Sequence, residues 1–105
     1  MTPQSILLAR SIVAGTSRIT GFKDIAASLV PGTELTLRRQ RDHFYDDWAI
    51  RVYDNRQRFM GYVSCEHNEI IARLLDGGKR LSAVVHSCMT RGQWNRVVMD
   101  VMLND

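Results

Sequence analysis

Apolar and polar residues alternate in two segments of the chain, residues 33–39 and 49–53, which is the period of a half-buried β-strand. In residues 33–39, Leu35 and Leu37 lie on one side of the predicted strand and polar residues on the other. Other segments carry runs of Ile, Leu and Val that are typical of more buried strands. Together these patterns predict six strands, at residues 6–15, 33–39, 49–53, 58–63, 81–88 and 94–103.

Two segments repeat their apolar residues at helical spacing instead. The first is predicted to begin after Thr20 as its N-cap and to end at Pro31-Gly32. The second is predicted to begin after Ser64, with Glu66 in its first turn, and to end at Gly77-Gly78. The apolar stripes consist of Phe22, Ile25, Ala26 and Leu29 in the first helix and of Ile70, Ile71, Leu74 and Leu75 in the second.

Turn signals connect these elements in the order β-α-β-β-β-α-β-β. Residues 54–57 are typical of a hairpin turn, and residues 90–93 indicate that the last two strands pair antiparallel. Gly61, inside a predicted strand, predicts a β-bulge or a close approach of two backbones. The predicted fold class is therefore mainly β, with two short helices and six strands in a small antiparallel barrel or curled sheet.

Size and composition limit the class of protein. A length of 105 residues fits one domain, residues 1–105, and 45% hydrophobic with 24% charged residues excludes a disordered or collagen-like chain. The apolar runs are too short to span a membrane. The first residues also lack the basic segment followed by a long apolar segment that is typical of a secretory signal, so we do not expect one. Two cysteines are too few for a disulfide framework. We therefore expect an intracellular protein, cytoplasmic or located in a nucleoid or nucleus.

A basic and aromatic surface accompanies the central strands. The net charge of +3 permits a polyanionic partner, and Arg38 and Arg51 point to the solvent side of their strands. The arginines of this region are Arg38, Arg39, Arg41, Arg51, Arg56 and Arg58, and the aromatic residues among them are Phe44, Tyr45, Trp48 and Tyr53. Guanidinium groups bind phosphates, and aromatic rings stack on unpaired bases. Two interpretations remain open, a nucleic-acid surface or a solubilising arginine face whose aromatic rings pack in the core.

Motifs for catalysis are missing from the sequence. It has no glycine-rich phosphate loop before a helix, no G-x-S-x-G elbow and no H-E-x-x-H zinc motif. Asp42, Asp46 and Asp47 cluster in residues 41–47, a pattern more typical of a solvated loop than of an acid–base pair. We therefore expect a protein without enzymatic activity and without a cofactor.

The donor atoms of a tetrahedral zinc site occur in Cys65, His67, His86 and Cys88. His86 and Cys88 would share one face of a strand. Cys65 and His67, however, fall two positions apart in the first turn of a predicted helix, which separates their directions by roughly 200°. The spacing therefore disfavours zinc and favours two thiols and two imidazoles without a metal.

The central segment, residues 37–52 with the sequence LRRQRDHFYDDWAIRV, resembles the HIRAN domain family. The matching features are Arg39 in an alternating strand, then Tyr45-Asp46, then Ala-Ile-Arg-Val at residues 49–52. The similarity covers about residues 11–86, through Ile-Val-Ala-Gly-Thr at 12–16, Pro-Gly-x-Glu-Leu-x-Leu at 31–37, Gly-Tyr-Val at 61–63 and the helix at 66–78.

The resemblance implies an OB-like β-barrel that binds single-stranded DNA. Family members are often fused to SWI/SNF-type helicases, nucleases or ubiquitin ligases. This implies a link to DNA repair or replication and a helicase or nuclease acting in trans as a partner. In the best understood member, a pocket captures the 3′ end of a single strand.

The same resemblance implies roles for individual residues. Tyr45 would contact the terminal phosphodiester, and Asp46 would accept a hydrogen bond from the 3′-hydroxyl. Tyr62 would reach the DNA backbone, and Arg39 would lie at the rim of the pocket or brace the loop. From the residues alone, Tyr45 also fits an aromatic residue that packs within its loop, and Asp46 a turn residue bonded to its own backbone.

The sequence departs from the family's pattern at several of these places. The Arg-Tyr-Tyr that follows the glycine of the first strand is Ser-Arg-Ile here, at residues 17–19. A stacking ring is therefore missing unless Phe44 replaces it or Arg18 stacks through its guanidinium. His43 and Phe44 replace Asn-Pro, and Cys65 stands near an expected lysine. The resemblance thus supports the domain more strongly than 3′-end specificity.

The resulting prediction is a non-catalytic DNA-binding module that recognises a single strand or a 3′ end. The candidate DNA-binding residues are Arg18, Arg39, Arg41, His43, Phe44, Tyr45, Asp46 and Tyr62. The alternative is a protein-interaction or adaptor module without nucleic-acid binding. That module would use exposed apolar residues such as Met60, Met89 and Met102.

Overall fold

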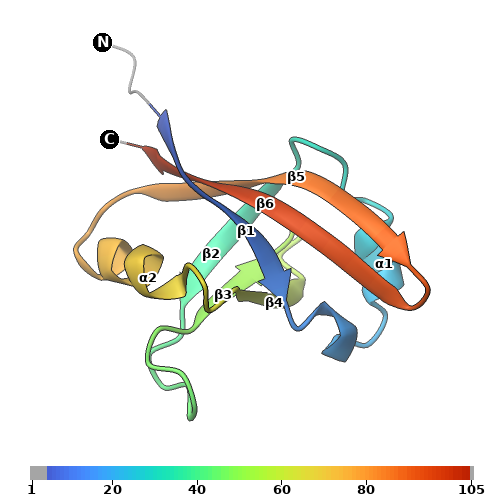
Figure 1. The fold of residues 1–105 in the computed structure, drawn as a ribbon, viewed down its shortest axis with the longest axis horizontal. Helices are drawn as coiled ribbons and strands as arrows, with labels where there is room; N and C mark the ends of the chain where they lie inside the picture. The colour runs from blue at the N-terminus through green and yellow to red at the C-terminus, as the bar shows by residue number, and fades with distance from the viewer. Residues whose placement is uncertain (1–4, 105) are drawn as a thin grey trace.

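The computed structural model describes residues 5–104; residues 1–4 and 105 of the predicted domain lie outside the described part. Six strands form a closed antiparallel barrel in the order β1-β4-β3-β2-β5-β6 (Figure 1). The strands are β1 (Ser5–Ala14), β2 (Glu34–Arg39), β3 (Ile50–Tyr53), β4 (Phe59–Val63), β5 (Leu81–Arg91) and β6 (Trp94–Asn104). The helices are the short 3-10 helix η1 (Thr16–Arg18), α1 (Phe22–Ala26) and α2 (Asn68–Asp76). The predicted class, a mainly β, OB-like barrel with two short α-helices, is confirmed.

The barrel has a long side and a short side. β5 and β6 form a hairpin of two 11-residue strands, and β1 pairs along β6 (Figure 1). The other three strands have only 4 to 6 residues each. The long side joins β4 through the pairs Val13–Val63 and Ala14–Tyr62. The short side, β2-β3-β4, carries most of the residues that the sequence singles out.

The core fills the interior of the barrel with the inward residues of each strand. Leu35, Ile50 and Val52, which the alternation predicts on one face, are all buried. Met60 of β4 is also wholly buried, so its predicted part in a partner surface is wrong. Met89 is 50% exposed. The alternative of an interaction surface therefore loses one of its three methionines to the core.

Both helices begin later than the sequence predicts. α1 follows Gly21, whose φ of 74° lies in the left-handed region, and Thr20 does not cap it. α2 follows His67 rather than Ser64. The Ser64 hydroxyl instead accepts a hydrogen bond from the backbone N–H of Glu66, which forms a turn ahead of the helix. A side chain that satisfies a backbone donor in a local turn competes with helix capping, which explains the later start of α2.

The buried face of α2 is rotated from the predicted one. Ile71 and Ala72 are wholly buried, whereas Ile70, expected in the core, is 55% exposed. The hairpin of β5 and β6 is also longer than predicted, because its pairing continues to Arg91 and Trp94. Within residues 5–104, neither α-helix has the length and apolar character needed to cross a membrane.

Gly61 confirms the prediction of a bulge and a close backbone approach. Val52 pairs with Gly61 and Tyr53 with Phe59, so Met60 between them is the extra residue of a bulge. Gly61 has a φ of 146°, and a Cβ built on it would lie 2.3 Å from the carbonyl oxygen of Ala14. Only glycine allows β1 and β4 to approach this closely.

Candidate nucleic-acid interface

The outer face of β2-β3-β4 places two cations side by side. Arg38 and Arg51 are directly opposite each other in the β2–β3 pairing. Like charges at such a position are destabilising, and within residues 5–104 neither guanidinium forms an ion pair with a carboxylate. A pair of uncompensated guanidinium groups on one face is a feature that an anionic ligand would relieve.

Neutral groups hold these guanidinium groups in place. Arg51 donates from Nε to Gln40 Oε1 at 2.9 Å and from one terminal nitrogen to the Tyr53 hydroxyl at 3.2 Å. The hydrogen bond with Tyr53 raises the pKa of Arg51 further above its ordinary value. The guanidinium of Arg38 lies over the Tyr53 ring, 5.0 Å from its centroid. Both cations are therefore oriented while their charge stays available.

An unbroken row of six rings runs from this face to the tip of the β2–β3 loop. In order, this aromatic track consists of Tyr53, Phe59, Tyr62, His43, Tyr45 and Phe44, with consecutive ring centroids 5.8, 5.4, 5.4, 6.4 and 4.8 Å apart. The guanidinium of Arg51 lies over Phe59, 5.0 Å from its centroid. Cations interleaved with stacking rings are the usual composition of a surface that binds single-stranded nucleic acid.

A groove of ≈ 660 Å³ lies beside the middle of the track, between β4 and η1. Arg18, Ile19, His43 and Tyr62 line it. The structure thus brings together three of the predicted residues, Arg18, His43 and Tyr62. The Tyr62 hydroxyl donates to Gln40 Oε1 at 2.9 Å. Ile19 occupies the wall where the family's pattern has an aromatic residue.

The loop between β2 and β3 is ordered by hydrogen bonds from its own residues. His43 Nδ1 accepts the backbone N–H groups of Tyr45 and Asp46, both at 3.1 Å. Because Nδ1 is the acceptor, Nε2 is the nitrogen that carries the proton of the neutral ring. Asp46 Oδ1 accepts the backbone N–H of Trp48 at 2.9 Å, and its Oδ2 accepts the Asn68 side-chain amide at 2.8 Å.

Asp46 therefore acts as a turn residue that bonds the backbone of its own turn, as the second interpretation of the sequence predicts. Each of its oxygens already accepts one hydrogen bond, but an ionised carboxylate has about four acceptor positions. A hydroxyl group could still bind to it. Asn68, which holds the second oxygen, is 4% exposed and lies at the start of α2.

Arg39 braces the loop and does not line the groove beside Tyr62. Its guanidinium forms two hydrogen bonds with the carboxylate of Asp76, at 3.0 and 3.2 Å. It also donates to the carbonyl oxygens of Ala49 and Asp47, at 2.9 and 3.1 Å. Its side chain is only 12% exposed. Since its donors are used within the protein, the geometry favours the second of the two roles that the resemblance implies.

Arg41 shares the same carboxylate from the solvent side. A terminal nitrogen of Arg41 lies 2.9 Å from Asp76 Oδ1, and its side chain is 69% exposed. The hydrogen bond from Arg39 is the main cause that lowers the pKa of Asp76. Trp48 lies between the guanidinium groups of Arg39 and Arg73, 5.9 and 4.5 Å from them. Trp48 therefore packs against this brace and the core, and no ring of the aromatic track contacts it in the described chain.

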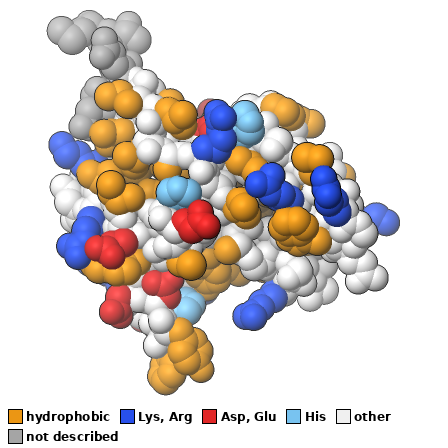
Figure 2. All heavy atoms as spheres, in the orientation of Figure 1, with side chains coloured by type: hydrophobic (Ala, Val, Ile, Leu, Met, Phe, Trp, Pro, Cys, Tyr) orange, Lys and Arg blue, Asp and Glu red, His pale blue; other side chains and the backbone are white. Residues whose placement is uncertain are grey.

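The two aromatic residues at the loop tip are exposed. Phe44 and Tyr45 are each 88% exposed, and Figure 2 shows hydrophobic side chains projecting where this loop extends from the barrel. Tyr45 touches other rings of the track but does not pack in the core, which disfavours the interpretation of a loop-packing residue. Sequence reasoning did not single out Gln40, Phe59 or Asn68 as site residues.

The zinc candidates do not form a common site. His67 and His86 line a groove of ≈ 380 Å³ next to Arg10. Cys88 faces the opposite side of β5, because a bulge between Val85 and Ser87 shifts the register at His86. In residues 5–104, no three His, Cys, Asp or Glu side chains are placed to hold a metal ion together. The expected shared face of His86 and Cys88 is wrong.

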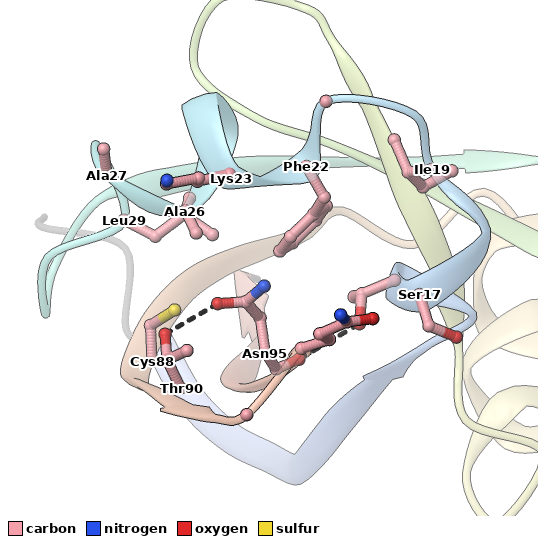
Figure 3. Close-up of a pocket in the computed structure, with 14 residues that line it drawn as sticks. Ser17, Ile19, Phe22, Lys23, Ala26, Ala27, Leu29, Cys88, Thr90 and Asn95 are labelled. Carbon is pink, nitrogen blue, oxygen red and sulfur yellow. Dashed lines mark hydrogen bonds between the residues drawn. The ribbon is translucent and has the colours of Figure 1, made fainter.

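A further groove of ≈ 700 Å³ lies between α1 and the end of the β5–β6 hairpin (Figure 3). Phe22 and Cys88 line it, and burial raises the pKa of the Cys88 thiol, which favours its protonated form. Asn95 accepts the Thr16 hydroxyl through its backbone oxygen at 3.0 Å and the Thr90 hydroxyl through Oδ1 at 2.7 Å. None of the predicted DNA-binding residues lines this groove.

Comparison with known proteins gives a family and two similar structures. The model of the HIRAN domain matches residues 8–104. A protein from Lactobacillus plantarum is 23% identical, with a TM-score of 0.88 and 98% of both chains covered. The HIRAN domain of human HLTF is 19% identical, with a TM-score of 0.73 and with 96% of this chain and 80% of that chain covered. No curated protein matches the chain. At these identities the two structures support the fold, and the family model supports the membership.

Proposed function

We propose a DNA-binding function on the premise that this chain belongs to the HIRAN domain family, which is known for binding DNA. The proposed ligand is a single strand that lies across the outer face of β2-β3-β4. The observation that carries the proposal is the opposed pair Arg38 and Arg51, which lacks carboxylate partners in residues 5–104 and lies on the aromatic track. The guanidinium groups would bind phosphates, and the rings would stack on bases.

The groove beside Tyr62 is the proposed site for a strand end. The guanidinium of Arg18 makes no hydrogen bond or ion pair with another residue of the described chain, so it is available to a phosphate or a base. His43 Nε2–H and Tyr45 lie next to this groove, and Asp46 retains acceptor positions for a 3′-hydroxyl. Ile19 and Arg18 in place of an aromatic pair imply weaker stacking of the last base than the family's pattern provides.

In this proposal the chain binds DNA and catalyses no reaction. Its partner would be a helicase or a nuclease that acts on the same strand. An interaction module without nucleic-acid binding is the alternative. Its support is an exposed apolar stretch on β1, where Ile6 and Leu7 are 61% and 49% exposed. No charge pattern identifies what such a surface would bind.

Fluorescence anisotropy with labelled oligonucleotides tests the proposal. We expect a single strand to bind more tightly than a duplex of the same sequence. We also expect the logarithm of the binding constant to fall linearly with the logarithm of the salt concentration. A strand with a 3′-hydroxyl should bind more tightly than one blocked by a 3′-phosphate. Absence of binding at low salt, or binding without a salt slope, would contradict the proposed function.

A further inference from the structure

Two aromatic rings at the tip of the β2–β3 loop are covered by no part of the described chain. Phe44 and Tyr45 are the most exposed of the large hydrophobic residues in residues 5–104, at 88% each. Their rings meet edge to face, 4.8 Å apart. Large apolar side chains are stabilised by leaving water, so this tip favours a contact with another apolar surface.

Hydrogen bonds hold the backbone of the tip on both sides of the two rings. His43 Nδ1 accepts the backbone N–H of Tyr45 at 3.1 Å, and Arg39 holds the carbonyl oxygen of Asp47 at 3.1 Å on the other side of the tip. Asp46 is fixed between them by Asn68. A loop that is already ordered loses little conformational entropy when it binds. The backbone that carries the two rings is therefore positioned in advance for their contact.

The charge around the tip indicates which kind of surface it contacts. Asp42 and Asp47 flank the two rings and both are exposed. These carboxylates would repel a phosphate or an anionic membrane surface that approached the tip directly. The cations Arg38 and Arg51 lie further back, on the sheet. The face of a base pair is flat and uncharged, and since the two ring planes are 82° apart, one ring can stack on it while the other supports that ring edge-on.

We propose that Phe44, supported edge-on by Tyr45, forms a wedge that stacks on the last base pair of a duplex from which a single strand continues onto the aromatic track. This inference rests on the proposed function. The track runs without a break from the tip through His43 to Tyr62. A strand that leaves the duplex at the tip therefore passes directly onto stacking rings. The substrate class becomes a duplex with a single-stranded tail instead of a free strand.

The test compares two probes, a tailed duplex and the isolated tail, by anisotropy at one salt concentration. We expect the protein to bind the tailed duplex about tenfold more tightly, an effect in the range of one aromatic ring stacked on a base. Phe44→Ala should bring the ratio of the two affinities close to one. Phe44→Trp should preserve the ratio, and Phe44→Leu, which is apolar but not flat, should lose most of it.

Val30→Ala is the matched control, because Val30 is 60% exposed but lies outside the loop and the track. It should leave the ratio unchanged. A fluorescent base analogue in the last base pair should respond to the native protein and not to Phe44→Ala. Equal affinity of the native protein for both probes, or a ratio that survives Phe44→Ala, overturns the wedge and leaves the proposed function standing. Absence of binding to either probe overturns both.

Discussion

Arg38 and Arg39 are neighbours on β2, yet their surroundings are opposite. The guanidinium of Arg38 lies over Tyr53 on the outer face and forms no ion pair in the described chain. The guanidinium of Arg39 is spent on Asp76 and on two carbonyl oxygens. Successive residues of a strand point to opposite faces. Whether an arginine of this strand is structural or available to a ligand therefore depends on the face of the strand to which its side chain points.

The same contrast recurs between Arg51 and Arg58. Arg51 is held by neutral groups, whereas Arg58 forms an ion pair with Asp54 at 2.7 Å. Asp54 is wholly buried and also accepts the backbone N–H groups of Arg56 and Arg58. The charge of Arg58 is thus compensated by Asp54 within the β3–β4 turn, whereas the charge of Arg51 on the sheet face has no carboxylate partner in the described chain.

Removal of the buried carboxylate should have the largest effect. We expect Asp54→Ala to lower the free energy of unfolding by about 3 kcal/mol, because it leaves Arg58 and two backbone donors without their partner. Urea denaturation measures this loss. A change below about 1 kcal/mol would show that the turn does not depend on the ion pair.

Substitution of the two neighbours on β2 should separate stability from binding. We expect Arg39→Gln to cost about 2 kcal/mol of unfolding free energy, since four hydrogen bonds are lost. Arg38→Gln should change stability by less than about 0.5 kcal/mol. Thermal and urea denaturation of both variants give the comparison. Equal destabilisation would mean that Arg38 is also a structural residue.

The structural carboxylates should make stability fall in acid. Hydrogen bonding to Arg39 lowers the pKa of Asp76. Burial alone would raise the pKa of Asp54, but hydrogen bonds from Arg58 and Arg56 outweigh it and the pKa is lowered. A carboxyl group with a lower pKa in the folded state stabilises above its unfolded pKa of about 4 and loses that contribution as pH falls through the folded value.

Urea midpoints between pH 7 and pH 2.5 measure this dependence. We expect stability to decline below about pH 4. The decline should be shallower in Arg39→Gln, which no longer lowers the pKa of Asp76, and unchanged in Arg38→Gln. A native profile that is flat or rises in acid would contradict the assignment of these carboxylates.

The smallest expected effect concerns end recognition at Asp46. Asp46→Asn keeps a side-chain oxygen for its turn but removes the charge. We expect the preference for a 3′-hydroxyl over a 3′-phosphate to shrink by about fivefold, which corresponds to about 1 kcal/mol, the typical net contribution of one hydrogen bond. Anisotropy with matched oligonucleotides measures both affinities. Equal losses on the two ends would refute end recognition by Asp46 and leave strand binding intact.

Alternation along the strands was sufficient to predict the face that carries the proposed interface. Because Leu35 and Ile50 point into the core, Arg38 and Arg51 had to point outward, and the structure confirms this arrangement. The resemblance to the family added Tyr62, whose phenol lines the groove. These predictions depend only on local period and on motif order, which a single sequence contains.

Local pattern could not predict what bulges and distant contacts determine. Strict alternation would place Phe59 and Tyr62, which are three residues apart, on opposite faces of β4. The bulge at Met60 puts them on one face, with their ring centroids 5.4 Å apart. A second bulge separates His86 from Cys88. The bond from Asn68 to Asp46 joins α2 to a loop 22 residues earlier, and no local pattern announces such a contact.

The most direct test of the account is the double variant Arg38→Gln/Arg51→Gln. Its matched control is Arg91→Gln/Arg96→Gln, which removes two exposed charges from the long hairpin. We predict that the first variant binds single-stranded DNA at least about tenfold more weakly and that its salt slope falls by about 1.4, while the control changes little. Equal weakening in both variants, or an unchanged slope in the first, would contradict the claim that these two guanidinium groups bind the strand.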